Sequence, residues 1–180
     1  MRARLVICTT LLATIVANAE QNNIAEIVVE PYQAIVQVNG IVCSFCAYGT
    51  EKNLSKLSFL DDSQFGNDGV LIDIQSHRIT LALQPDQEFD LAQVYDAIKK
   101  GGYDPVSFYV NVHGQVQKDG DRYLLISPDS GQAFEIIGDD AARLVDRGLI
   151  NVKGQVDVGR VADIELGQPI PVVMASSATD

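Results

Sequence analysis

The order of hydrophobic patterns between residues 32 and 112 is the feature that most constrains the fold of this chain. Alternating apolar residues predict a strand over 32–39. After a short loop that contains two cysteines, Thr50, Leu54 and Leu57 fall on one face of an expected helix. The chain therefore begins its folded part with a strand, a loop and a helix.

The pattern continues with "VLIDIQSHRITLAL", which predicts a hairpin with strands at 70–75 and 78–83. Asp90 is an expected N-cap of a second helix, and a final strand is expected over 106–112. The resulting order is strand, helix, strand, strand, helix, strand. This order is typical of a split βαβ, ferredoxin-like sandwich.

The remaining chain, residues 114–172, has a different character. Strands are expected in "GQVQKDGDRYLLI" and "QAFEII", a short helix in "DDAARLVDRG", and two more strands in "LINVKGQVDV" and "VADIEL". This order predicts a small OB-like β-barrel. Residues 173–180 are expected to be a flexible tail. The predicted class is thus α+β, with a ferredoxin-like domain followed by an OB-like one.

The N-terminus carries the features of a secretory signal peptide. Arg2 and Arg4 precede an apolar run over 5–16, and Ala-Asn-Ala ends at residue 19. We therefore expect residues 1–19 to be removed, which leaves a leader over 20–31 and a first domain over 32–113. The expected location is outside the cytoplasm, in the periplasm. No later apolar run is long enough to span a bilayer, so no stable membrane insertion is expected.

The chain is strongly acidic, with 13 Lys and Arg against 24 Asp and Glu and a net charge of −11. Loss of residues 1–19 removes two arginines and no acid, so the charge becomes −13. Such a surface repels phosphate backbones. Nucleic acid is therefore not an expected partner.

Loss of the signal peptide also leaves only two of the three cysteines, Cys43 and Cys46. They are separated by two residues in the loop that precedes the first helix, where the helix N-terminus favours the thiolate form. Two thiolates suit a soft ion, most of all Cu(I) or Hg(II), while Zn(II) prefers four ligands. We expect Cu(I), with Hg(II) or Zn(II) as alternatives.

Over residues 32–112 the chain resembles the heavy-metal-associated domain family, which includes copper chaperones and periplasmic mercury-binding proteins. The matching residues are Gly40, Cys43 and Cys46 in "GIVCSFC", Thr50-Glu51, Leu54, Leu57 and Gly102-Tyr103. Ile41 and Thr50 stand where the family usually has Met and Val, and 58–69 is longer than usual. The resemblance implies a metal carrier that transfers its ion by thiolate exchange to a metal transporter or a metalloprotein acceptor.

The expected topology places His77 and Tyr103 at the same end of the sandwich as the cysteine loop. Tyr103 is a candidate to cover the metal, and His77 is a candidate third ligand or a proton-sensitive contact. For His77 the alternative is a solvated turn residue, and for Tyr103 it is ordinary packing.

Two other roles of the cysteines remain open. The same C-x-x-C motif serves thiol–disulfide redox proteins, although the chain lacks the Trp that usually adjoins it in thioredoxin-type enzymes. A structural disulfide would stabilise little, because so short a loop removes little entropy from the unfolded chain. No set of residues suggests a catalytic centre, so we expect a binding protein rather than an enzyme, with an extracytoplasmic thiol–disulfide partner as the alternative.

Overall fold

The structure is a computed structural model, and it describes residues 27–66, 68–161 and 164–179, without the side chains of Cys46 and of 175–179. The predicted signal peptide and most of the predicted leader therefore lie outside the described residues. None of the helices in these ranges is long and apolar enough to cross a membrane.

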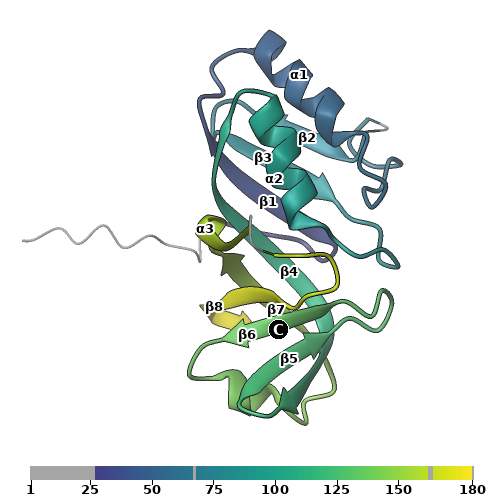
Figure 1. The fold of residues 1–180 in the computed structure, drawn as a ribbon, viewed down its shortest axis with the longest axis vertical. Coiled ribbons are helices and arrows are strands. Elements are labelled where there is room, and N and C mark those ends of the chain that lie inside the picture. The colour runs from purple at the N-terminus through teal and green to yellow at the C-terminus, as the bar shows by residue number, and fades with distance from the viewer. Residues whose placement is uncertain (1–26, 67, 162–163, 180) are drawn as a thin grey trace, which may run out of the picture.

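The first half of the molecule contains the predicted order of elements, and the mixed α+β class is confirmed. Its strands form a sheet in the order β2-β3-β1-β4, and all neighbours are antiparallel. Two helices pack against each other over one face of this sheet (Figure 1). The elements are β1 (Gln33–Asn39), α1 (Ser44–Leu54), β2 (Val70–Asp73), β3 (Arg78–Ala82), α2 (Leu91–Lys100) and β4 (Asp104–Asp119).

The second helix follows its sequence signals closely. The Asp90 carboxylate accepts two hydrogen bonds from Gln93, one from its backbone N–H at 3.0 Å and one from its side-chain amide at 2.8 Å. Leu91, Val94 and Ile98 are buried on the inner face of α2, as predicted. The capping pair and the apolar stripe act together, so both the start and the orientation of α2 were predictable.

The hairpin differs from the prediction because its turn is longer. The Asp73 carboxylate accepts hydrogen bonds from the backbone N–H groups of Gln75 at 2.9 Å and of Ser76 at 3.3 Å. These bonds take up donors that would otherwise continue the ladder. As a result β2 ends at Asp73 and β3 begins at Arg78.

The second half contains five paired strands, of which β4 is the first. The pairs β4–β5, β5–β6, β6–β8, β8–β7 and β7–β4 close a ring, and only β6–β8 is parallel. The further elements are β5 (Arg122–Ile126), β6 (Ala133–Ile137), the 3₁₀ turn η2 (Ala141–Leu144), β7 (Leu149–Val156), α3 (Val158–Val161) and β8 (Ile170–Thr179).

Two predictions for the C-terminal part were wrong. "VADIEL" is not a strand: Val161 ends the short helix α3, and 164–166 are irregular. The last strand instead occupies Ile170–Thr179, which includes most of the predicted flexible tail. The polar residues there follow the apolar start of β8, and pairing with β6 and β7 holds this segment in the sheet.

Strand β4 belongs to both halves of the molecule. It pairs with β1 near its start and with β7 from Phe108 to Gln115. The predicted boundary between the two domains, at residues 113 and 114, therefore lies inside a continuous paired strand. The buried apolar side chains of the two halves also form one cluster, which extends from Ala34 to Val172. Figure 1 shows β4 running from the helical half into the strand ring.

Candidate metal-binding site

The cysteine loop is held to the core by the residues that precede it. Gly40 has a φ of +93°, a conformation that favours glycine, and it turns the chain away from β1. The next side chain, Ile41, is fully buried in the core. Ile41 thus anchors the start of the loop in the interior of the molecule.

Cys43 lies immediately before α1, in the N-cap position. Its carbonyl oxygen accepts the first helical hydrogen bond, from the Ala47 N–H at 3.1 Å. Cys43 is half-buried and is disulfide-bonded in this structure. Because the helix begins at Ser44, Cys46 belongs to the first turn of α1, whereas the sequence suggested that it preceded the helix.

Tyr103 lies beside the loop, as the topology predicted. Its side chain is 5% exposed, and its Cδ1 would lie 3.5 Å from a Cβ atom built on Gly40. The phenol oxygen is buried and has no hydrogen-bond partner among the described residues. The ring therefore packs against the start of the loop and brings an unpaired hydroxyl to this end of the core.

His77 is at the same end of the sheet, but its side chain is exposed. Its backbone carbonyl accepts a hydrogen bond from the Val38 N–H at 3.0 Å, which places the hairpin turn beside the end of β1. A positive φ of 53° fits a turn position. The structure therefore brings the backbone of His77 near the loop and leaves its ring in solvent.

Thr50 forms a close contact between α1 and the C-terminal end of α2, below the loop. It is fully buried on α1, and its hydroxyl has no hydrogen-bond partner among the described residues. A Cβ atom on Gly101 would lie 2.9 Å from the Thr50 Cβ and 3.1 Å from its Cα. Only glycine at 101 thus allows the C-terminal end of α2 to approach α1 this closely.

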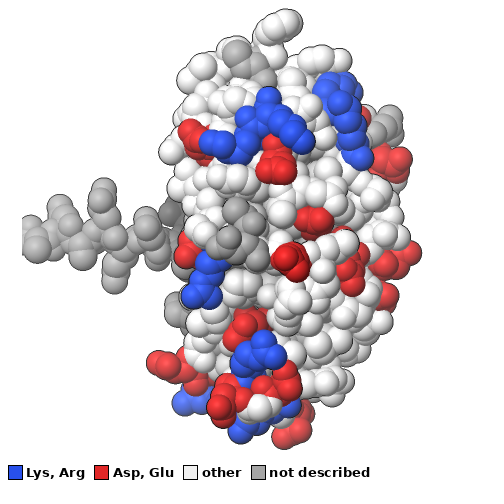
Figure 2. Space-filling view, in the orientation of Figure 1, with Lys and Arg blue, Asp and Glu red and all other residues white. Residues whose placement is uncertain are grey.

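The surface around the start of α1 is apolar and exposed. Val42 is 77% exposed, Phe45 87% and Tyr48 55%. Figure 2 shows no charged side chain at the top of this face, where α1 begins. We call Val42, Phe45 and Tyr48 the apolar rim. Sequence reasoning missed it, because the same residue types at the same spacing also occur in cores.

Charged groups begin about one turn further along α1. The Lys52 ammonium lies 5.5 Å from the centre of the Tyr48 ring and 3.5 Å from an Asp68 carboxylate oxygen. Burial raises the pKa of the Glu51 carboxyl, and a hydrogen bond with Asp68 raises it further. At the C-terminal end of α2, Lys99 pairs with Asp104, and this bond raises the pKa of Lys99.

Among the side chains that the structure describes, no group of three or more His, Cys, Asp and Glu residues could hold a metal ion. The Cys46 side chain is not among them. The other histidine, His113, lies far from the loop along β4, where its Nδ1 is 3.3 Å from the side-chain oxygen of Asn151.

Comparison with known proteins identifies no family. No protein-family model matches the chain, and no curated protein matches it. A solved structure described as a CopZ metallochaperone is similar over 41% of this chain and 98% of its own, with 22% sequence identity and a TM-score of 0.35. At this TM-score the match is not a basis for assigning a function.

Proposed function

We propose that this protein is an exported carrier of a soft metal ion, most specifically Cu(I), which it binds through the thiolates of Cys43 and Cys46. Export is proposed on the basis of the signal-peptide features of residues 1–19. The metal assignment rests on the chemistry of two thiols at this place, because soft thiolates select Cu(I) over harder ions.

The observation that carries the proposal is the position of the C-x-x-C motif at the start of α1. Cys43 is the N-cap residue and Cys46 lies in the first turn, so both positions are at the helix N-terminus. The partial positive charge there favours thiolates over thiols. Thiolates are the form that binds metal, so this position suits a ligand pair.

The strand orders support the two fold assignments that accompany the proposal. The order β2-β3-β1-β4 with two helices on one face fits a ferredoxin-like half. In the ring, three consecutive antiparallel strands are followed by the parallel pair β6–β8 and the closing pair β7–β4. We propose that this ring is an OB-type barrel.

The apolar rim supports transfer to a protein acceptor. Three large side chains around the start of α1 are more than half exposed, and such residues commonly mark contact surfaces. In the proposed transfer, an acceptor thiolate binds Cu(I) while one thiolate of this protein leaves, and a second exchange completes the step. The ion stays Cu(I) throughout, so transfer requires no electron donor.

Loading does require reduction, because Cys43 is disulfide-bonded in this structure. A dithiol reductant would supply two electrons and two protons to release the thiols, and it would itself become a disulfide. Metal would then displace the thiol protons. We therefore expect Cu(I) to bind the reduced protein and not the oxidised one.

Titration with Cu(I) against a competing chelator tests the proposal. The reduced protein should bind one Cu(I) per chain, and the double variant Cys43→Ser, Cys46→Ser should lose at least about a hundredfold in affinity, since both thiolate ligands are gone. Equal binding by the two proteins would refute the carrier function. His77→Ala provides a further comparison, and unchanged affinity is expected because the ring is exposed.

A second function, thiol–disulfide exchange with a partner protein, is favoured by the disulfide state of Cys43. The reduction potential of the Cys43 disulfide separates the two functions. A redox partner should equilibrate with a glutathione buffer and reduce or oxidise a model dithiol protein at a rate that depends on Cys43. A carrier should bind Cu(I) tightly and show little thiol–disulfide exchange with the model dithiol protein.

A further inference from the structure

The apolar rim surrounds the place where an acceptor has to dock. Phe45 and Val42 have the two largest exposed fractions among the large apolar side chains that the structure describes. Val42 directly precedes Cys43, and Phe45 and Tyr48 lie one turn apart on one side of the helix that Cys43 caps. Even a small protein interface buries several hundred Å² on each partner. A protein that docks on Cys43 therefore also covers the rim.

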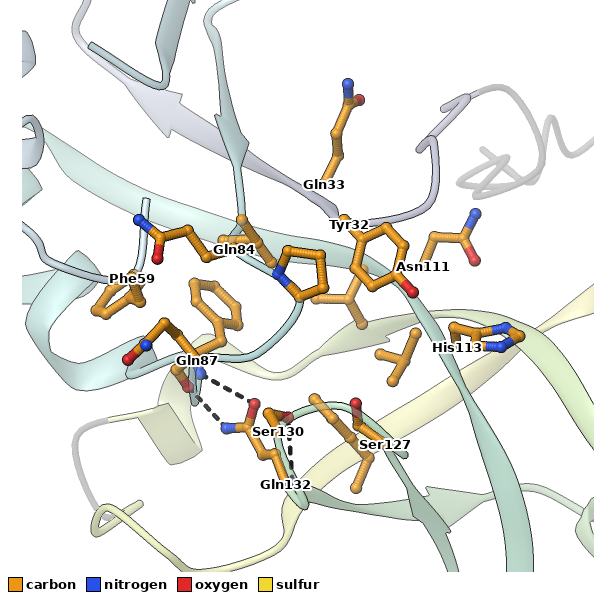
Figure 3. Close-up of a pocket in the computed structure, with 16 residues that line it drawn as sticks. Tyr32, Gln33, Phe59, Gln84, Gln87, Asn111, His113, Ser127, Ser130 and Gln132 are labelled. Carbon is orange, nitrogen blue, oxygen red and sulfur yellow. Dashed lines mark hydrogen bonds between the residues drawn. The ribbon is translucent and has the colours of Figure 1, made fainter. Parts of the chain in front are cut away.

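The chain buries its aromatic side chains where its own two halves meet. Phe59, Phe89 and Phe134 line a cleft at this junction, and each is at most 5% exposed. The Gln132 side chain accepts a hydrogen bond from the Phe89 N–H and donates one to the Phe89 carbonyl, both at 2.9 Å (Figure 3). No Asp, Glu, Lys or Arg lines this cleft. The rim, in contrast, has large apolar side chains that no described part of the chain covers.

The charges at the cysteine-loop end of the helical half compensate each other. The first pair below is an ion pair, the second has the i, i+4 spacing of helix neighbours, and the third lies directly opposite across the β2–β3 ladder. These pairs are Lys99 with Asp104, Asp96 with Lys100, and Asp73 with Arg78.

This local balance differs from the charge of the molecule. The chain as a whole carries −11, which by itself would favour a basic partner. The end that has to meet an acceptor offers no comparable excess of charge, and Figure 2 shows no charged side chain where α1 begins. Recognition at this end therefore depends on apolar contact rather than on charge.

We propose that the acceptor presents an uncharged, apolar, concave surface beside its own thiolate pair, and that this surface binds Phe45. The inference rests on the proposed function, because docking at the rim serves transfer only if Cys43 and Cys46 carry metal. Phe45 protrudes furthest and is 87% exposed, so its ring gains the most contact on docking. A rim of three side chains is small, as suits a transient complex that separates after transfer.

Two synthetic acceptor peptides test this chemistry. Both contain one C-x-x-C motif, which is flanked by Leu in one peptide and by Ser in the other, and each carries a fluorophore that Cu(I) quenches. Stopped-flow mixing with the reduced, Cu(I)-loaded protein measures the rate of transfer. We expect transfer to the Leu peptide to be at least about fivefold faster, which corresponds to about one buried apolar contact.

A variant pair assigns this preference to Phe45. Phe45→Gln should reduce the ratio of the two rates to within about twofold, and comparison of both peptides with both proteins cancels any intrinsic difference between the peptides. Leu149→Gln is the matched control, because Leu149 is 57% exposed at the start of β7 in the strand ring and should leave the ratio unchanged. An increase in NaCl from about 50 mM to about 500 mM should alter the wild-type rate by less than about twofold, since apolar contact is not screened.

Each result separates this inference from metal carriage. If the reduced wild type fails to bind Cu(I) in the chelator titration, both proposals fall. If it binds Cu(I) but transfers equally fast to both peptides, if Phe45→Gln keeps the preference, or if salt slows transfer steeply, only the apolar acceptor is refuted. Binding to phosphatidylcholine vesicles, or a dimer in sedimentation, that Phe45→Gln abolishes would assign the rim to a membrane or to a second copy and would also overturn it.

Discussion

Thr50 and Gly101 show how single residues determine the packing beneath the cysteine loop. Thr50 was predicted on the inner face of α1 by its spacing from Leu54, and both are fully buried. Its contact with Gly101 was not predictable, because it joins two residues that are 51 positions apart in the chain. The sequence signals marked Gly101 only as the end of α2, whereas the structure shows that it also leaves room for Thr50.

Replacement of Gly101 by Ala should therefore destabilise the protein. The added methyl group would meet the Thr50 side chain and its Cα, and overpacking of this kind costs about 1–3 kcal/mol. Urea unfolding measures the change. Gly49→Ala is the matched control: nothing lies within 4 Å of a Cβ atom at this helical position, so it should stabilise by about 0.5–1 kcal/mol. Equal effects of the two variants would contradict the close contact.

At the scale of elements, the local signals placed α2 and β1 almost to the residue. They were less accurate for α1, which begins at Ser44 and ends at Leu54. The helix starts early because the chain enters helical conformation directly from Cys43, which is not one of the residue types preferred at an N-cap. A carboxyl group on this helix, that of Glu51, also makes stability depend on pH.

The pair of carboxyl groups formed by Glu51 and Asp68 should make stability depend on pH. The pKa of Glu51 is raised in the folded protein, chiefly by burial and then by the hydrogen bond with Asp68. A carboxyl with a raised pKa favours folding while it is protonated, below its unfolded pKa of about 4.3, and this contribution is lost as the pH rises through the folded value.

Glu51→Gln should therefore raise the melting temperature at pH 7, and the gain should shrink below about pH 4, where Glu51 itself is protonated. The gain should stay within about 0.5 kcal/mol, as is usual at surface positions. Thermal unfolding at a series of pH values measures it. Glu88→Gln, at an exposed position before α2, controls for the loss of one negative charge. A gain that is the same at pH 3 and pH 7 would refute this account.

At the scale of the whole molecule, closure of the strand ring depends on the last strand. β8 lies between β6 and β7, pairs with both, and buries Ile170 and Val172 in the common core. Its removal would open the ring and expose the edges of two strands to solvent. The C-terminal segment is thus part of the fold rather than an appendage.

A chain that ends at Gln168 should lose cooperative thermal unfolding, or its midpoint should fall by at least about 10 °C, since several buried apolar side chains are lost. A chain that ends at Thr179 keeps all of β8 and should unfold like the full chain. Circular dichroism during heating measures both. If the shorter chain unfolded normally, the segment would be a tail, as the sequence suggested.

The sequence by itself determined the α+β class, the order of elements up to β4, and the position of the cysteines between a strand and a helix. These features depend on periodicity and capping, which act between residues close in the chain. Only the tertiary structure decided that β4 serves both halves, that residues 170–179 form the closing strand, and that a neutral cleft lies at the junction. Such features come from pairing between distant segments, for which a local pattern carries no signal.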